Sequence, residues 1–108
     1  MRPRTYYLEL FEVTYIFCLK WSREDIRKHM LRHYGEQVNV AGEDGFCDMI
    51  NNDIIIWTLL NDDSTLLHEC IHATNMTFLH VGHRPDPNND ELTAYLTGLI
   101  FKKAKRTK

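Results

Sequence analysis

The chain lacks any apolar run of membrane-spanning length in its 108 residues. A membrane helix needs roughly 20 consecutive apolar residues, so the composition argues against a membrane protein. The apolar stretch from Tyr6 to Leu19 is interrupted by Glu9 and Glu12 and lacks a small-residue cleavage site, which is not the pattern of a secretory signal. No internal repeat or low-complexity linker is present. The sequence therefore predicts one cytoplasmic domain spanning residues 1–108.

Cysteine is scarce, and no excess of positive charge is present. Cys18, Cys47 and Cys70 are odd in number and lie far apart in apolar contexts, which predicts buried reduced thiols and neither disulfides nor metal ligands. Five of the thirteen basic residues lie in the tail, residues 102–108, so residues 1–101 carry a net charge of −7. Cations at a helix C-terminus are favoured by the helix dipole. The tail is therefore interpreted as a solvated helix end, and the acidic body argues against nucleic acid as a partner.

The sequence HECIH at residues 68–72 is the most informative motif. Histidines four apart on a helix lie on one face and can bind one metal ion, which predicts zinc. Glu69 is rotated by about a third of a turn from His68, too far to bind the same ion comfortably but close enough to reach a water on it. We therefore predict His68 and His72 as metal ligands and Glu69 as the general base.

A catalytic zinc site takes three protein ligands and leaves one position to water, so a third ligand is needed. Phe78 stands where the metzincin spacing would require histidine, which excludes that subclass. Residues 86–90 are typical of a loop and N-cap, so Glu91 would lie in the first turn of a new helix and is the preferred third ligand, with His83 as the alternative. A glutamate in a first turn can also serve only the helix dipole.

Together, HECIHA at residues 68–73 and NDELTAYL at residues 89–96 resemble the small gluzincin-type zinc metallopeptidases, particularly the compact HExxH proteins common in phages and bacteria. The resemblance covers residues 54–101. It implies a zincin-like fold with His68, His72 and Glu91 as zinc ligands and Glu69 as general base. It also implies that the strand Ile54 to Leu60 is the edge along which an extended substrate lies. Larger gluzincins often carry aspartate where this chain has Tyr95.

The remaining pattern predicts an α/β (α+β) fold. A strand is expected within Tyr6 to Trp21, starting near Leu10, although helical spacing in the same stretch leaves a helix as the rival. A helix from Arg23 to Tyr34 follows a Ser22 cap. Two further strand segments flank Asn51-Asn52 and suggest an antiparallel meander. The sheet from Leu10 to Leu60 is expected to be antiparallel or mixed. The HExxH helix and a last helix from Glu91 to about Lys105 follow it.

Two further features of the predicted helices indicate structural roles and no particular chemistry. His29 and His33 repeat the four-residue histidine spacing, but basic residues surround them and no glutamate lies between them in the right place, so we interpret them as solvated surface residues. Ala94 and Gly98 are small, which would let the last helix approach a neighbouring helix closely.

These observations predict a zinc metallopeptidase acting on peptide or protein substrates through a water activated by Zn²⁺, with a shallow, open site because the chain is too short for a two-lobed cleft. The alternative is a metal-stabilised binding module, for instance a phage-encoded protein that engages a host partner. A purely structural site would usually fill all four metal positions with protein ligands and would gain nothing from Glu69. The motif therefore favours the hydrolase.

Overall fold

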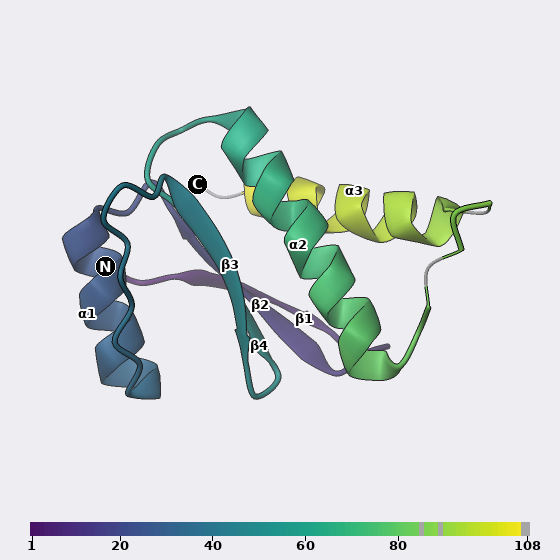
Figure 1. Cartoon of the computed structure of the whole chain (residues 1–108), viewed down its shortest axis with the longest axis horizontal. Helices are drawn as coiled ribbons and strands as arrows, with labels where there is room; N and C mark the ends of the chain where they lie inside the picture. The colour runs from purple at the N-terminus through teal and green to yellow at the C-terminus, as the bar shows by residue number, and fades with distance from the viewer. Residues whose placement is uncertain (85, 89, 107–108) are drawn as a thin grey trace.

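A computed structural model of the chain describes residues 1–84, 86–88 and 90–106 and has four strands and three helices (Figure 1). The α+β class expected from the sequence is confirmed, with a mixed sheet followed by two helices. In chain order, the elements are β1 (Arg4–Leu8), β2 (Val13–Leu19), α1 (Arg23–Tyr34), β3 (Gly45–Ile50), β4 (Asp53–Thr58), α2 (Asp63–Val81) and α3 (Glu91–Lys105).

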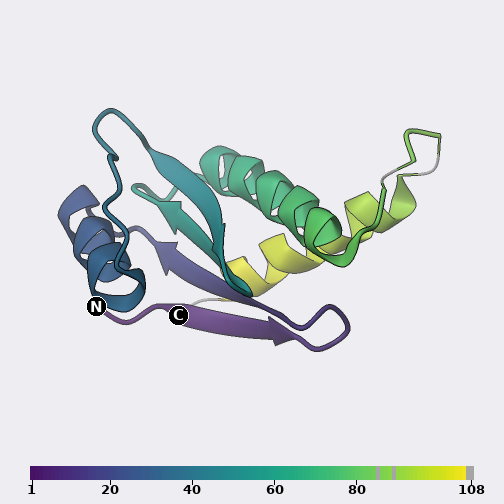
Figure 2. The same cartoon turned by 60° about the horizontal axis from the view of Figure 1, so that its bottom comes forward.

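The sheet has the strand order β1-β2-β4-β3, with β1 and β3 at opposite edges (Figure 2). β1 pairs with β2, and β3 with β4, in antiparallel hairpins. The two inner strands β2 and β4 run parallel, in register from Thr14 opposite Asp53 to Leu19 opposite Thr58. A parallel pair needs a crossover, and α1 supplies it. The antiparallel pairing expected around Asn51-Asn52 is confirmed for β3 and β4, and the parallel central pair makes the sheet mixed.

A turn lies between β1 and β2, so the strand expected within Tyr6 to Trp21 is present as β2 but begins at Val13 and not near Leu10. Leu10 itself is exposed, and Glu12 adopts a left-handed backbone with φ of 55°. The amide of Glu12 donates to the carbonyl of Glu9 at 3.2 Å, which closes the turn. Both carboxylates are exposed there. The two charges that interrupt the apolar stretch thus lie in a hairpin turn between β1 and β2.

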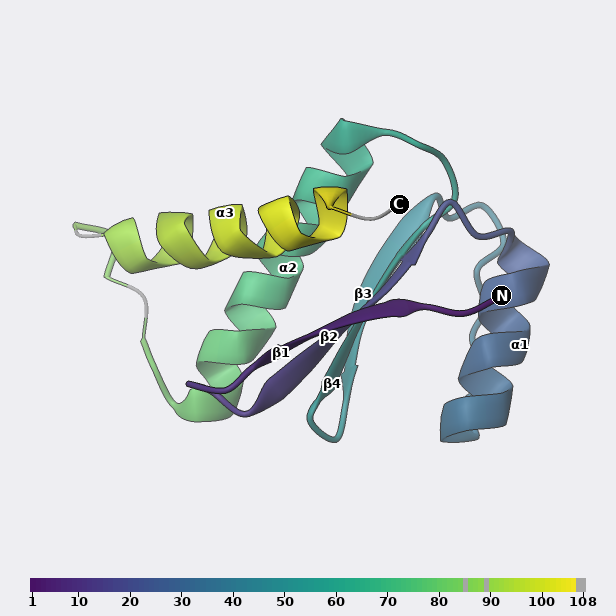
Figure 3. The same ribbon diagram turned by 180° about the vertical axis from the view of Figure 1, so that it is seen from behind.

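The two faces of the sheet are covered by different helices. Alternate residues of β2 face opposite ways, so Tyr15 and Phe17 pack in one apolar cluster while Ile16 and Cys18 pack in the other. The first cluster lies under α2 and α3 and the second under α1 (Figures 1 and 3). β4, the run Ile54-Ile55-Ile56-Trp57, is buried on both faces, as its apolar sequence predicts.

α1 begins and ends where the sequence predicts. The Ser22 hydroxyl accepts a hydrogen bond from the amide of Asp25 at 3.1 Å, and Gly35 ends the helix with φ of 67°. These caps satisfy backbone groups that a helix end leaves without partners. Ile26 and Met30 are buried against the sheet. Their burial fixes the face that α1 turns toward β2 and β4.

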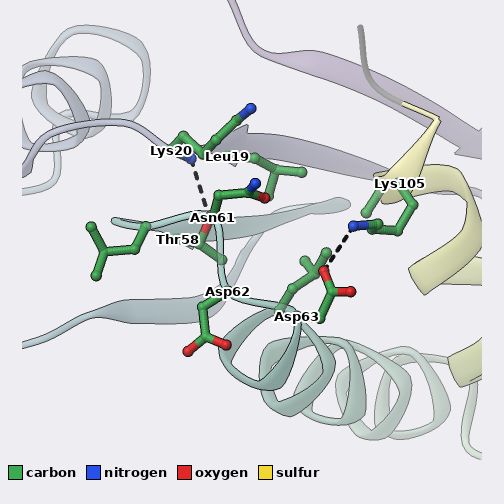
Figure 4. Close-up of a pocket in the computed structure, with 10 residues that line it drawn as sticks. Leu19, Lys20, Thr58, Asn61, Asp62, Asp63 and Lys105 are labelled. Carbon is green, nitrogen blue, oxygen red and sulfur yellow. Dashed lines mark hydrogen bonds and ion pairs between the residues drawn. The ribbon is translucent and has the colours of Figure 1, made fainter.

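α2 and α3 cross on the other side of the sheet, and two polar side-chain contacts connect them. The hydroxyls of Thr74 and Thr97 lie 2.7 Å apart, and Lys105 Nζ donates to Asp63 Oδ1 at 2.8 Å (Figure 4). The ammonium of Lys103 lies 4.8 Å from the ring centre of Tyr6, which places α3 against β1. Within the described part of the chain, no helix has the length and apolarity needed to cross a bilayer.

Gly98 lies on the exposed side of α3, and a Cβ added there would meet no atom within 4 Å. The expected use of Gly98 and Ala94 for close approach to a neighbour is therefore wrong, since both are exposed. Glycine destabilises a helix interior relative to alanine. We expect Gly98→Ala to raise the free energy of unfolding by about 0.5–1 kcal/mol in urea denaturation. A decrease would show that this surface of α3 is covered.

Candidate metal centre

α2 is a 19-residue helix that contains the HExxH motif. Asp62 caps it by accepting hydrogen bonds from the amide of Ser64 at 3.0 Å and the hydroxyl of Thr65 at 2.8 Å. Gly82, with φ of 75°, ends the helix. The motif therefore lies inside regular helix and not at a frayed end.

His68 and His72 each bring one ring nitrogen within hydrogen-bond distance of the other. Their Nε2 atoms lie 3.1 Å apart, and the ring centres are separated by 4.6 Å. Two nitrogens bound tetrahedrally to one zinc ion, each at about 2.05 Å, lie roughly 3.3 Å apart. Both rings are exposed on the helix surface. The pair thus has the spacing for one ion that solvent can reach.

Glu69 completes the group. One ligand atom from each of His68, Glu69 and His72 lies within 4.8 Å of the other two, an arrangement that could hold a metal ion. Two imidazole nitrogens with a carboxylate oxygen are donors that zinc and several other divalent ions accept. The residues present therefore fit a divalent metal, but with Glu69 as general base the described residues supply two of the three protein ligands that a catalytic zinc site takes, and the other positions are open to water or substrate.

The Glu69 side chain differs from the histidines in burial, with only 6 % of its surface exposed. Burial raises the pKa of this carboxyl above its usual value, and Glu43 contributes in the same direction, while His68 and His72 oppose the shift. A carboxylate with a raised pKa is a better proton acceptor near neutral pH than an exposed one. The environment of Glu69 thus suits a general base.

The strand beside Glu69 is β3, and β3 is an edge of the sheet. The substrate edge expected at Ile54 to Leu60 is wrong, because β4 lies between β2 and β3 and both of its sides are paired. Strand order has no local signature in the chain, because the inner position of β4 depends on its parallel pairing with β2.

Gly45, the first residue of β3, is a site residue that the sequence alone did not point to. A Cβ built there would lie 3.4 Å from Glu69 Oε2, 3.0 Å from Thr65 Cγ2 and 2.7 Å from the carbonyl oxygen of Trp57. Glycine within a strand often marks such a close approach of backbone to a neighbour. Because Gly45 precedes an alternating apolar segment, this rule was the one sign in the sequence that a neighbouring element approaches the backbone closely at Gly45.

Substituting Gly45 tests how closely β3 approaches α2. We expect Gly45→Ala to lower the free energy of unfolding by about 1–3 kcal/mol, because the added methyl overlaps the Trp57 carbonyl and forces the strand or the helix to shift. Urea denaturation measures the change, and Gly98→Ala is the matched control with open space around its Cβ. Wild-type stability for Gly45→Ala would contradict the close approach.

Glu91, the predicted third ligand, is not brought to the histidine pair. Among the described residues, the metal-competent group contains only His68, Glu69 and His72. Glu91 instead begins α3 and lines a separate hollow of about 530 Å³ with His83, whose ring packs 4.6 Å from that of Phe78. The alternative ligand His83 is therefore also elsewhere in this structure.

Helix geometry explains this separation. α2 contacts α3 through Thr74, whose hydroxyl meets Thr97. At about 100° per residue, His72 points roughly 160° away from Thr74 around the helix and His68 roughly 120° away. The motif therefore faces the β3 side of α2, while α3 lies on the other side. The spacing within HECIH predicts how residues 68, 69 and 72 lie relative to one another on the helix. It carries no information on the side of α2 against which α3 packs.

Comparison of the chain with protein-family models, with curated proteins and with solved structures finds no match. The resemblance to gluzincin-type metallopeptidases therefore stays a prediction from the motifs. The functional reading of this surface depends on the geometry of His68, Glu69 and His72 and on the neighbouring strand edge.

Proposed function

We propose that the chain is a zinc-dependent hydrolase of peptide bonds, with His68 and His72 holding the metal and Glu69 serving as general base. The observation that carries the proposal is the convergence on α2 of two exposed imidazole nitrogens and one buried carboxylate oxygen, all within 4.8 Å of one another. A stabilising metal site would usually be closed by four protein ligands, whereas this group leaves positions open. The open positions support a catalytic role over a structural one.

The exposed and the buried residues of the site would have different chemical roles. The exposed His68 and His72 imidazoles would bind zinc, which when bound supplies Lewis acidity that acidifies a water and polarises a carbonyl. Glu69, whose carboxyl is buried and has a raised pKa, takes the proton from the attacking water and delivers it to the leaving amine. Both transfers use the same carboxylate, so the side chain needs no other partner for the proton.

The free edge of β3 supports an extended peptide as the substrate. The Leu59 amide donates to the Asp44 carbonyl at 2.8 Å, so by antiparallel alternation the backbone groups of Gly45, Cys47 and Met49 point away from β4. Asp48 Oδ1 already accepts the Met49 amide at 2.9 Å. Pairing is then limited to the part of the edge nearest Glu69, and because backbone groups dominate, we expect loose side-chain preference.

Metal dependence is the experiment that tests this proposal. The purified chain is stripped of metal, reloaded with zinc and assayed on an unfolded, fluorescently labelled protein. We expect hydrolysis only with metal, loss of both zinc and hydrolysis in His68→Ala, and retention of both in His80→Ala. His80 is the matched control because it is an exposed histidine on the same helix outside the metal group. Hydrolysis that persists without metal would overturn the proposal.

A metal-stabilised binding module is a second candidate, favoured by apolar side chains exposed on α2 and α3. Tyr95 and Leu79 are 70 % and 81 % exposed, and Leu67, Ile71 and Leu92 are also exposed. Exposed apolar groups of this kind can mark a protein interaction surface. If the zinc-loaded wild type cleaves nothing across a broad screen, and Glu69→Gln keeps the biological effect of the wild type, this candidate replaces the hydrolase.

A further inference from the structure

A second histidine pair lies on α1, on the opposite face of the sheet from α2 (Figures 1 and 3). The ring centres of His29 and His33 are 4.4 Å apart, close to the 4.6 Å that separates His68 from His72. His33 is exposed, as expected for a solvated residue. His29 is not, and this departs from the expectation: its ring is partly buried and packs edge-on against Trp21 at 5.3 Å.

The pair lines a cavity of about 400 Å³ where four segments of the chain meet. Its polar lining includes Tyr34 and Asp53, and Tyr34 donates its hydroxyl hydrogen to Asp53 Oδ2 at 2.9 Å. A carboxylate oriented by a neighbouring hydroxyl is a common arrangement around metal ligands. The cavity therefore holds two imidazoles and one oriented carboxylate.

His29 Nε2 is a buried polar atom with no hydrogen-bond partner among the described residues. Buried polar atoms in native proteins are nearly always paired, so an unpaired one indicates a ligand, an ion or a water at that position. Burial lowers the pKa of the His29 imidazole, and the neighbouring His33 adds to this effect. A neutral imidazole offers a free lone pair, which a metal ion can accept.

We propose that His29 and His33 form a second site for a divalent transition metal, with the Asp53 carboxylate as the oxygen donor across the cavity. Two imidazoles with one carboxylate are a donor set that such ions prefer. The ligand atoms of these three side chains do not all lie within 4.8 Å of one another, unlike those of the α2 group. Asp53 would therefore bind the metal after a side-chain rotation or through a bridging water. Arg2 also lines the cavity, but the Asp53 carboxylate and the unpartnered His29 Nε2 favour a cation over an anion.

This site is independent of the proposed hydrolase. Its ligands come from α1 and the start of β4, whereas the first group lies on α2 alone. A metal at the second site would tie α1 to the sheet and raise the temperature of unfolding. It would also double the metal content of the purified protein, so metal analysis of the wild type alone would overstate the occupancy of the α2 site.

Zinc titration of the full-length, metal-stripped chain tests the proposal, with stoichiometry read by native mass spectrometry and affinity by competition with a chromophoric chelator. We expect two zinc ions for wild type and for His80→Ala, and one for His33→Ala and for His68→Ala. His33→Ala is the preferred variant because His33 is exposed, so the fold is retained. Circular dichroism checks this, and we expect zinc to raise the unfolding temperature less in His33→Ala than in wild type.

Asp53→Asn is a second variant, in which we expect zinc affinity at the α1 site to fall at least tenfold while the α2 site is unchanged. The proposal is overturned if His33→Ala binds as many zinc ions as wild type, or if wild type binds one ion that His68→Ala removes. If wild type binds one ion that His33→Ala removes and His68→Ala keeps, the second site is supported and the proposed hydrolase site fails.

Discussion

Replacing Glu69 by glutamine is expected to reduce hydrolysis by about a hundredfold to ten-thousandfold while zinc content and thermal stability stay near those of wild type. Glutamine keeps nearly the same shape but cannot accept the proton from the attacking water. Glu69 is buried beside Gly45, where the isosteric amide adds almost no volume. Turnover on an unfolded protein substrate, measured with saturating zinc, gives the ratio between the two proteins.

Glu43→Gln is the matched control for this substitution. Glu43 acts on the pKa of Glu69 through its charge, yet it lies outside the metal-competent group. We expect Glu43→Gln to retain turnover within a few fold of wild type. Full turnover in Glu69→Gln would show that another group is the base, and loss of zinc in that variant would show that Glu69 is a ligand.

The largest loss of stability is expected for Trp57→Ala, at about 3–5 kcal/mol. Trp57 is fully buried in β4, and its Nε1 donates a hydrogen bond to the carbonyl of Trp21 at 2.9 Å. Its ring centre lies 5.4 Å from that of Phe46. Alanine would remove this packing, leave a cavity under α1 and deprive the Trp21 carbonyl of its donor. Urea denaturation at neutral pH measures the change in free energy of unfolding.

Tyr95→Ala is the corresponding control on the surface. The Tyr95 side chain is 70 % exposed on α3, so its truncation should change the free energy of unfolding by no more than about 0.5 kcal/mol. A large loss for Tyr95→Ala, or a loss below about 1 kcal/mol for Trp57→Ala, would contradict the burial that the fold assigns to these two aromatics.

Local features of the fold follow from the sequence because their causes are local. Ser22 and Gly35 delimit α1 through capping interactions that involve only neighbouring residues. The apolar run of β4 likewise predicts that this strand is buried on both faces. Strand order is different, because the parallel pairing of β2 with β4 depends on contacts between segments far apart in the chain.

The candidate site shows the same division. His68, Glu69 and His72 lie on one helix, so their proximity follows from helical spacing, and the structure brings them together. The position of Glu91 depends on how α3 packs against α2, and Thr74 meets Thr97 on the side away from the motif. Gly45 reaches Glu69 only because β3 is the edge strand on that side. Residues that depend on tertiary packing were therefore misplaced or missed.

The central parallel pair also has a consequence for the order of folding. The hairpins β1–β2 and β3–β4 each close over a short turn, so either can form soon after its residues leave the ribosome. β2 pairs with β4 only after α1 and the intervening segment have been synthesised, and this loop closure slows folding. Until residue 58 emerges, the apolar strand Val13–Leu19 has one unpaired side. The nascent chain is then most prone to aggregation, and chaperone binding should concentrate on that strand.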